Sequence, residues 1–322
     1  MPNLMVTNAC NLACSYCFGM EQMYPRRKKE FMSREVFLSL LDWLTRSDQH
    51  YFHIMGGEPT QHPDFLWMLA MAAEQSFVVD IFSNGITGFS KEKMDQVSQL
   101  SRTWIINVNN PKNYPPGKRS KLECLLQVLS EKAVLTFNII NTDYDPSYLF
   151  EYINTYKLQR TIKIGITLPT LDKSNVHSRP EEFNNLSRSV LNLSILFKKE
   201  GIGAEFECGV PYCFFTEKDQ KKLKQNNFKF ESHCDSILDI LPDGNIIYCL
   251  PLAGMVRLNY KDFPTYPDLH SHMHALYRPY RSVGYKKSCL ACNSKKVCNG
   301  SCLARIIPEF MGGAVADAAP WS

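Results

Sequence analysis

The stretch that decides the fold lies at the start of the chain. Residues 4–18 read Leu-Met-Val-Thr-Asn-Ala-Cys-Asn-Leu-Ala-Cys-Ser-Tyr-Cys-Phe. The apolar run 4–7 predicts a β-strand, and three cysteines follow it closely, at Cys10, Cys14 and Cys17. In a parallel α/β sheet the loops after the strands converge on one mouth, where ligands bind. We therefore expect the three thiols to face one metal centre at that mouth.

Three thiols are one short of the four that a structural zinc ion or a closed [4Fe–4S] cluster needs. An incomplete ligand set leaves one iron free to bind another molecule. A structural zinc ion with a distant fourth ligand is the alternative.

The next 200 or so residues alternate between short apolar runs and segments with helical spacing. Strands are predicted at 51–55, 77–82, 103–109, 133–140 and 161–168. Helices are predicted at 33–46, 64–75, 90–100, 119–130, 146–156 and 181–199, with Ser33, Asp64 and Ser90 as N-caps. Six β-α units in succession imply a parallel sheet with right-handed crossovers. Because a closed barrel needs eight, we expect an α/β fold with a partial (β/α)6 barrel.

The spacing Cys10-x3-Cys14-x2-Cys17, followed by Phe18, resembles the cluster motif of the radical S-adenosylmethionine (SAM) enzymes. Further matches follow the second to sixth predicted strands in the order typical of that family. Gly56-Gly57-Glu58-Pro59 resembles the stretch that contacts the SAM amino group. The resemblance also implies SAM-contact roles at the later strands, for Ser83, Asn84, Asn107, Asn109, Asn138 and Ile164. It covers roughly residues 3–203.

The resemblance also implies the cofactors and the chemistry. The family uses SAM and a [4Fe–4S] cluster whose open iron binds the amino and carboxylate groups of SAM. One-electron reduction then gives a 5′-deoxyadenosyl radical that takes hydrogen from the substrate. The partners implied are a flavodoxin- or ferredoxin-type reductant and the substrate itself.

The chain has twelve cysteines, an even number that raises the possibility of disulfides. Its length, its apolar content and the absence of a secretory signal favour reduced thiols that bind metal instead. Eight of the twelve lie beyond residue 204, at Cys208, Cys213, Cys234, Cys249, Cys289, Cys292, Cys298 and Cys302. Helical periodicity is weak there, so we expect a boundary near residue 203 that divides domains 1–203 and 204–322. Cys124 stands alone and is expected to pack in the core.

The pattern Cys234-x9-Gly244-x4-Cys249, then Cys289-x2-Cys292-x5-Cys298-x3-Cys302, resembles the SPASM extension of radical SAM enzymes. That extension carries one or two auxiliary [4Fe–4S] clusters, and Gly244 predicts a hairpin between two ligands. The usual last cysteine is missing, since residues 303–322 contain none. By analogy the first auxiliary cluster would use Cys213, Cys234, Cys249 and Cys302. The second would use Cys289, Cys292 and Cys298, with Cys208, Asp317 or an open position as the fourth ligand. A pair of zinc knuckles is the alternative.

Other polar residues receive weaker interpretations. His270, His272 and His274 are expected in a solvated loop, although a metal site is an alternative. The basic run 26–29 is read as a solvated charge cluster or a docking site for an acidic partner. His62 is a candidate for orienting the glycine stretch, and Tyr16 for donating hydrogen.

The leading hypothesis is a radical SAM enzyme that oxidises or crosslinks a peptide or protein side chain. The alternatives are the same chemistry on a small molecule, an iron–sulfur electron carrier and a zinc-dependent interaction module. A net charge of +4 gives nucleic-acid or membrane binding no support. The sequence has no apolar run of 18 residues and no secretory signal, so a cytoplasmic location is expected. Because the first strand begins by residue 4, no separate leader-peptide-binding domain is expected before it.

Overall fold

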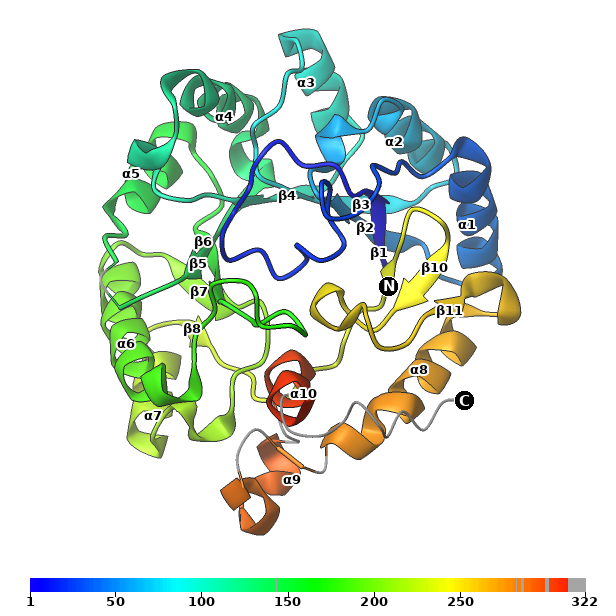
Figure 1. Ribbon diagram of the computed structural model, residues 1–322. Helices are drawn as coiled ribbons and strands as arrows, with labels where there is room; N and C mark the ends of the chain where they lie inside the picture. Colours follow the sequence, from blue (N-terminus) through cyan, green and yellow to red (C-terminus); the bar gives the residue numbers. More distant parts are fainter. Residues whose placement is uncertain (143, 282, 285–286, 299–300, 312–322) are drawn as a thin grey trace.

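A computed structural model describes residues 1–142, 144–281, 283–284, 287–298 and 301–311. Its strands form one sheet in the order β11-β10-β9-β1-β2-β3-β4-β5-β6-β7-β8. Neighbouring strands from β9 through β1 to β8 pair in parallel, whereas β10 pairs antiparallel with both β9 and β11. Figure 1 shows the sheet curving round a central space, with helices outside it. The expected α/β fold with a partial barrel is confirmed.

All six predicted strands are present. They are β1 (Asn3–Thr7), β2 (Tyr51–Gly56), β3 (Val78–Ser83), β4 (Thr103–Asn107), β5 (Ala133–Ile139) and β6 (Thr161–Ile166). Alternate apolar residues of these strands, such as Ile54, Ile81 and Ile106, are fully buried in the core that the helices cover. The period-2 alternation of side chains leaves the other residues of each strand facing the central space.

The predicted helices are present too. They are α1 (Arg34–Arg46), α2 (Phe65–Glu74), α3 (Lys91–Gln99), α4 (Pro116–Leu129), α5 (Ser147–Tyr156) and α6 (Phe183–Lys199). Ser33 and Ser90 cap their helices as expected, since each hydroxyl accepts a backbone N–H. Asp64 does not cap α2 with its side chain, which pairs instead with Arg34. Helix α4 begins three residues earlier than predicted, because Pro116 suits the first turn of a helix.

The chain beyond residue 203 contains more regular structure than its sequence suggested. Strand β7 (Gly203–Phe206), helix α7 (Glu217–Gln225) and strand β8 (Phe228–Lys229) add one more parallel unit. The expectation that the rhythm ends near residue 204 is therefore wrong. Strands of four and two residues are too short to show a period in sequence. The division into domains at residue 203 stays a prediction, and the sheet runs across that position.

The chain then crosses to the opposite edge of the sheet. Strand β9 (Asp239–Ile240) pairs with β1, and β10 (Asn245–Ile247) and β11 (Leu258–Asn259) follow it. Gly244 has φ +82° in the turn between β9 and β10, so the predicted hairpin is confirmed. Helices α8 (Tyr266–Arg281), α9 (Lys295–Cys298) and α10 (Leu303–Met311) complete the described structure. Figure 1 shows α10 lying between the two edges of the sheet.

None of the helices in the described ranges is both long enough and apolar enough to span a bilayer.

Candidate functional site

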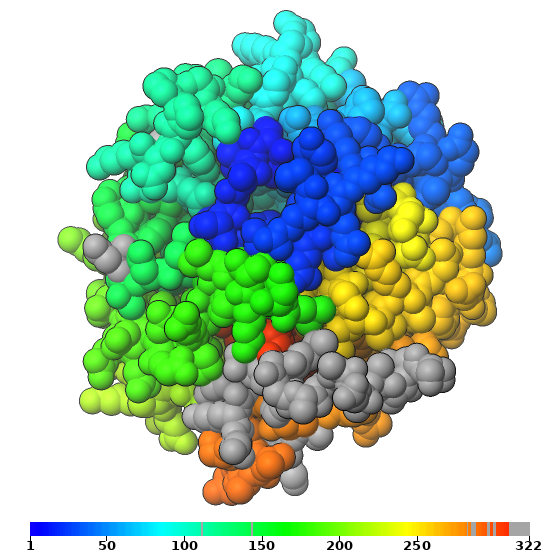
Figure 2. All heavy atoms as spheres, viewed as in Figure 1, coloured from blue at the N-terminus to red at the C-terminus, as the bar shows by residue number. Residues whose placement is uncertain are grey.

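The three N-terminal cysteines lie in the loop that follows β1. This segment, dark blue in Figure 2, lies across one face of the molecule. Burial raises the pKa of Cys10 and of Cys17 to about 11, and the neighbouring thiols of the trio add to both shifts. The trio is therefore close in space, as the spacing predicted. Metal ions that replace the thiol protons would neutralise the charge that burial disfavours.

The glycine stretch after β2 is pressed against the backbone of this loop. The amides of Gly57 and Glu58 donate to the carbonyl oxygens of Thr7 and Ala9, both at 2.8 Å. A Cβ atom on Gly57 would lie 2.6 Å from the carbonyl carbon of Ala9, which no real structure tolerates. Glycine is therefore required by the close approach of two backbones.

The Glu58 carboxylate is fully buried and joins the ends of β2 and β3. It accepts hydrogen bonds from the Thr60 hydroxyl at 2.7 Å, the Ser83 hydroxyl at 2.8 Å and the Asn84 amide at 2.7 Å. Burial raises the pKa of Glu58, while these donors oppose the shift. These hydrogen bonds link the ends of β2 and β3 through the Glu58 side chain. Pro59 is the first residue of the short helix η1 (Pro59–Gln61) that follows.

Asn84 extends this connection to the cysteine loop. Its Nδ2 atom donates to Asn11 Oδ1 at 2.8 Å and lies 3.9 Å from the Cys10 sulfur. Asn11 in turn donates to the carbonyl oxygen of Ile86 at 2.6 Å. Asn84 therefore orients the segment that carries Cys10.

A cavity of about 530 Å³ lies beside Cys14, between the cysteine loop and the ends of β4 and β5. Its lining includes Tyr16, Asn109 and Asn138, and the Tyr16 hydroxyl donates to Asn109 Oδ1 at 2.5 Å. Its volume is in the range of sites for small cofactors. The trio thus adjoins a space large enough for a cofactor or part of a substrate.

Asn107 of β4 and Asn138 of β5 carry polar side chains near the C-terminal ends of their strands. The Oδ1 atom of Asn107 is buried and has no hydrogen-bond partner among the described residues, so it is free to accept a donor. The Asn138 side chain lies over Gly165, where a Cβ atom would come within 3.0 Å of Asn138 Cγ. Ile164, in contrast, is fully buried in the core, and it does not line the cavity. Asn107 does not line the cavity either, whereas Asn109 and Asn138 do and offer polar groups to a cofactor there. The SAM-contact roles of the individual residues stay predictions.

Two charged residues near the cavity were missed in the sequence. Lys118 donates from Nζ to the carbonyl oxygen of Asn11 at 3.1 Å and lines the cavity. Glu207 follows β7 and accepts the Thr136 hydroxyl at 2.7 Å. It keeps an exposed surface, yet desolvation by the surrounding protein raises its pKa. The signal available was an acidic residue directly after a strand, but β7 was too short to be recognised.

The family model described as the radical SAM superfamily matches residues 4–128. This segment is similar to the radical SAM domain over that range. The match includes the cysteine trio, the glycine stretch and Asn84, whose packing is described above. It implies SAM and a [4Fe–4S] cluster as the cofactors.

Similar proteins include enzymes named as maturases. Mycofactocin maturase MftC of Mycobacterium ulcerans (strain Agy99) is 33% identical over 81 residues, which are 25% of this chain and 21% of MftC. Sporulation killing factor maturation protein SkfB of Bacillus subtilis (strain 168) is 28% identical over 103 residues, 32% of this chain and 24% of SkfB. The chain thus matches only about a fifth to a quarter of the length of these relatives.

The fold is similar to that of Streptococcus suis SuiB, whose structure has been solved bound to S-adenosylmethionine. The TM-score is 0.66 at 16% identity, over 95% of this chain and 74% of SuiB. A second structure, of SuiB bound to precursor peptide SuiA, gives a TM-score of 0.67 at 17% identity. At this identity the likeness shows a shared fold.

Beyond the radical SAM domain, four cysteines from separate segments form a second group. The thiols of Cys208 and Cys234 lie close enough to that of Cys302 to shift its pKa. The interaction with Cys208 is the largest cause that raises the pKa of Cys302 to about 11. Burial raises the pKa of Cys249, and Cys302 and Cys234 add to the shift. The contacts thus place Cys208 in the group for which the sequence analogy used Cys213.

Two arginines, the partly buried Arg281 and the buried Arg305, flank this second group. Arg281 donates to the carbonyl oxygen of Cys234, and Arg305 donates to that of Ile166 at 2.8 Å. Arg281 Nη1 and Arg305 Nε are buried and have no hydrogen-bond partner within the described part of the chain. Unpaired N–H groups beside thiols suit an anionic iron–sulfur cluster, whose sulfurs accept hydrogen bonds.

The remaining cysteines lie in the segments around α9. The amide of Tyr212 points at the Cys298 sulfur at 3.4 Å, which brings the neighbouring Cys213 to this region. Cys292 donates its amide to the carbonyl oxygen of Cys289 at 3.3 Å, in one short turn. Asp317 lies outside the described residues.

Three weaker expectations need correction or refinement. Cys124 is exposed, because the buried face of α4 consists of Leu122, Leu125, Leu126 and Leu129. The three histidines lie on helix α8, so the expected loop is wrong. The His62 ring nitrogens bond to the carbonyl oxygen of Met32 at 3.0 Å and to the amide of Asp64 at 3.0 Å, so its described hydrogen bonds are with backbone.

The basic run 26–29 meets solvent, and its Arg26 pairs with Asp172 at 3.6 Å. Exposed pairs of this kind contribute little stability.

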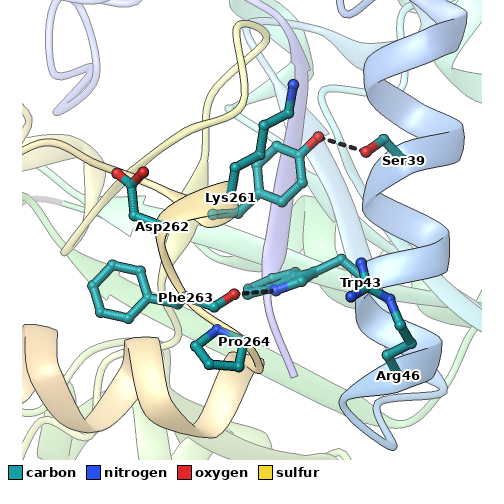
Figure 3. Close-up of a pocket in the computed structure, with 8 residues that line it drawn as sticks. Ser39, Trp43, Arg46, Lys261, Asp262, Phe263 and Pro264 are labelled. Carbon is teal, nitrogen blue, oxygen red and sulfur yellow. Dashed lines mark hydrogen bonds between the residues drawn. The ribbon is translucent and has the colours of Figure 1, made fainter.

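A second cavity, of about 540 Å³, lies between α1 and the segment around η7 (Tyr260–Asp262). Figure 3 shows Ser39, Trp43 and Arg46 of α1 facing Phe263 and Pro264. Trp43 Nε1 donates to the carbonyl oxygen of Phe263 at 2.9 Å, and Tyr260 donates to Ser39 at 2.8 Å. None of the predicted site residues lines this cavity, whose polar groups bond to each other across it.

Proposed function

We propose that this chain is a radical SAM enzyme that modifies a side chain of a peptide or protein, by oxidation or by crosslinking. The observation that carries the proposal is the trio Cys10, Cys14 and Cys17, gathered beside the glycine stretch and next to a cavity with polar walls. Three thiols leave one iron of a [4Fe–4S] cluster without a protein ligand. When bound, the cluster and SAM supply reductive cleavage of a carbon–sulfur bond and a radical that abstracts hydrogen.

The protein residues bind and position these groups. Gly56 and Gly57 allow the second strand end to approach the cysteine loop closely. Asn107 offers a free acceptor for a hydroxyl or ammonium group, and Asn109 holds Tyr16 over the cavity. Lys118 places a positive charge near Cys14 and fixes the loop through the carbonyl oxygen of Asn11. The N-terminal segment lies across this face of the molecule (Figure 2).

A peptide is the substrate class we favour. MftC and SkfB are named for maturation, and SuiB has been solved with a precursor peptide. Oxidation or crosslinking also releases a proton from the substrate. Glu207 is suited to accept it, since its exposed carboxyl group has a raised pKa and lies at the end of β7 next to Cys208.

We propose that residues 204–322 form a SPASM-like domain with two auxiliary clusters. The contacts support Cys208, Cys234, Cys249 and Cys302 as one ligand set. The position of Tyr212 supports Cys213 as the fourth ligand beside Cys289, Cys292 and Cys298. With these two ligand sets, each auxiliary cluster has four thiolates, so neither Asp317 nor an open position is needed as a fourth ligand.

The test is anaerobic reconstitution of the full chain, followed by addition of SAM and a strong reductant. We expect about twelve iron atoms per chain, four for each of three clusters, and formation of 5′-deoxyadenosine. A protein that holds clusters but forms no 5′-deoxyadenosine would be an electron carrier instead, and the proposal would be wrong.

The substrate is tested separately, by incubating the active enzyme with peptides encoded by neighbouring genes and measuring their mass. Loss of two mass units from a peptide, with 5′-deoxyadenosine, is the expected result of oxidation or crosslinking. Turnover of small molecules alone would overturn the choice of substrate and leave the radical chemistry intact. A flavodoxin- or ferredoxin-type reductant and a cytoplasmic location remain part of the proposal.

A further inference from the structure

Three metal-ligating side chains meet outside both cysteine regions. They are Asp235, His270 and His274, and their ligand atoms all lie within 4.8 Å of one another. Asp235 belongs to the segment before β9 and directly follows Cys234. The two histidines belong to α8, far along the chain. Only the tertiary structure brings these three side chains together.

The helix explains why His270 and His274 pair while His272 does not. Residues four apart lie one above the other on a helix, whereas residues two apart point to different sides. The rings of His270 and His274 lie 4.1 Å apart between centroids, at an angle of 30°. The ring of His272 packs against Phe263 instead, at 5.3 Å. The chain therefore provides two candidate ligands and a matched histidine on the same helix.

Neighbouring aromatic and polar groups pack against His270 and His274 near Asp235. The Tyr266 ring lies 5.8 Å from His270, and the Tyr248 ring lies 5.3 Å from His274. Nε2 of His274 lies 3.9 Å from Asp235 Oδ1 and 3.3 Å from the carbonyl oxygen of Ser236. The two His274 contacts with Asp235 and Ser236 link α8 to the segment that follows Cys234.

We propose that Asp235, His270 and His274 bind one divalent transition-metal ion of the zinc class. Two imidazole nitrogens and one carboxylate oxygen are a ligand set that zinc prefers, and it differs from the all-sulfur sets of the clusters. Ligands about 2.1 Å from a tetrahedral ion lie about 3.4 Å from each other. Closing the group by up to about 1.4 Å is within reach of Asp235, whose side chain is 76% exposed. Water would fill the fourth position.

The ion would act as a clip between α8 and the segment that carries Cys234. Arg281 already makes one such connection, because it donates to the carbonyl oxygen of Cys234 and to the Tyr248 hydroxyl. A metal ion about two to three turns earlier on α8 would make a second. It would fix the position of one cysteine of the Cys208 group without ligating it. This inference does not depend on radical chemistry.

The experiment measures iron and zinc in the same sample. The full chain, anaerobically reconstituted with its clusters, is dialysed against micromolar ZnCl₂, passed through a desalting column and analysed by mass spectrometry of the metals. We expect about one zinc ion per chain, with unchanged iron. His270→Ala and His274→Ala should each weaken zinc binding at least tenfold, while His272→Ala should bind as the unaltered chain does. Melting curves of each variant check that the fold is retained.

Two outcomes would overturn the proposal. Zinc that binds only as iron is lost would occupy cysteine sites, and no histidine site would be needed to explain it. Zinc that stays in the double variant of His270 and His274 would lie elsewhere. Asp235→Asn sharpens the assignment, since it should weaken binding and still leave the iron content unchanged.

Discussion

The two cysteine regions of this molecule are built in opposite ways. Cys10, Cys14 and Cys17 come from one loop after β1, so a single short segment carries all three sulfurs. The second group draws its cysteines from four segments: the loop after β7, the segment before β9, the end of the hairpin and the start of α10. A contiguous loop fixes its ligands by spacing alone. A group assembled from distant segments depends on the packing of the whole fold.

The comparison predicts that the first region alone controls SAM cleavage. Cys14→Ala should abolish formation of 5′-deoxyadenosine, since two thiolates cannot hold the cluster. Cys124→Ala is the matched control, because Cys124 is exposed on α4 and belongs to neither region. Chromatographic measurement of 5′-deoxyadenosine checks both variants. Normal cleavage by Cys14→Ala would show that the trio is not the SAM centre.

Double variants test the ligand sets of the second region. Replacing Cys208 and Cys302 by alanine should remove one cluster, about four iron atoms, because both belong to one set. Replacing Cys208 and Cys213 should remove about eight, because they belong to different sets. Iron analysis and electron paramagnetic resonance of the reduced proteins measure the loss. Equal losses in the two variants would contradict the division, while SAM cleavage should persist in both.

Glu207 directly precedes Cys208 and bonds to Thr136 of β5, and its substitution should separate SAM cleavage from product formation. Glu207→Gln keeps the shape and removes the proton acceptor, so product formation should fall roughly 100-fold or more. The 5′-deoxyadenosine yield should change little, since that step needs only the first region. Measuring the peptide product and 5′-deoxyadenosine in the same reaction shows whether only product formation falls. An equal fall of both would give Glu207 a structural role instead.

The glycine stretch tests how tightly the first region is packed. Gly57→Ala would push a Cβ atom into the backbone of Ala9, and overpacking of this kind costs about 1–3 kcal/mol. Gly117→Ala is the control, since nothing lies within 4 Å of the position of its added Cβ atom. Thermal unfolding and iron content measure the effect. Equal stability of the two variants would show that the close approach of the two backbones is relaxed in solution.

The six strands and six helices before residue 200 could be predicted because each is long enough to show its period. The N-terminal site could be predicted for the same local reason, since Cys10, Cys14 and Cys17 are close in sequence. The short strands β7 and β8 were missed, and Glu207 with them. Helix α8 was missed because its three histidines were read as alternating residues of an extended loop. Residues 270, 272 and 274 would share one face of an extended strand, but on a helix only 270 and 274 lie on the same side.

The sequence by itself determined the β-α order, the cysteine trio and the glycines that lie against it, because each depends on neighbouring residues. Only the tertiary structure decided that Cys208 joins Cys302, that β9 returns to the edge of β1 and that Asp235 meets two histidines of α8. The physical reason is the same in each case. These contacts join segments far apart in the chain, and their positions are set by sheet pairing and core packing, which no local spacing encodes.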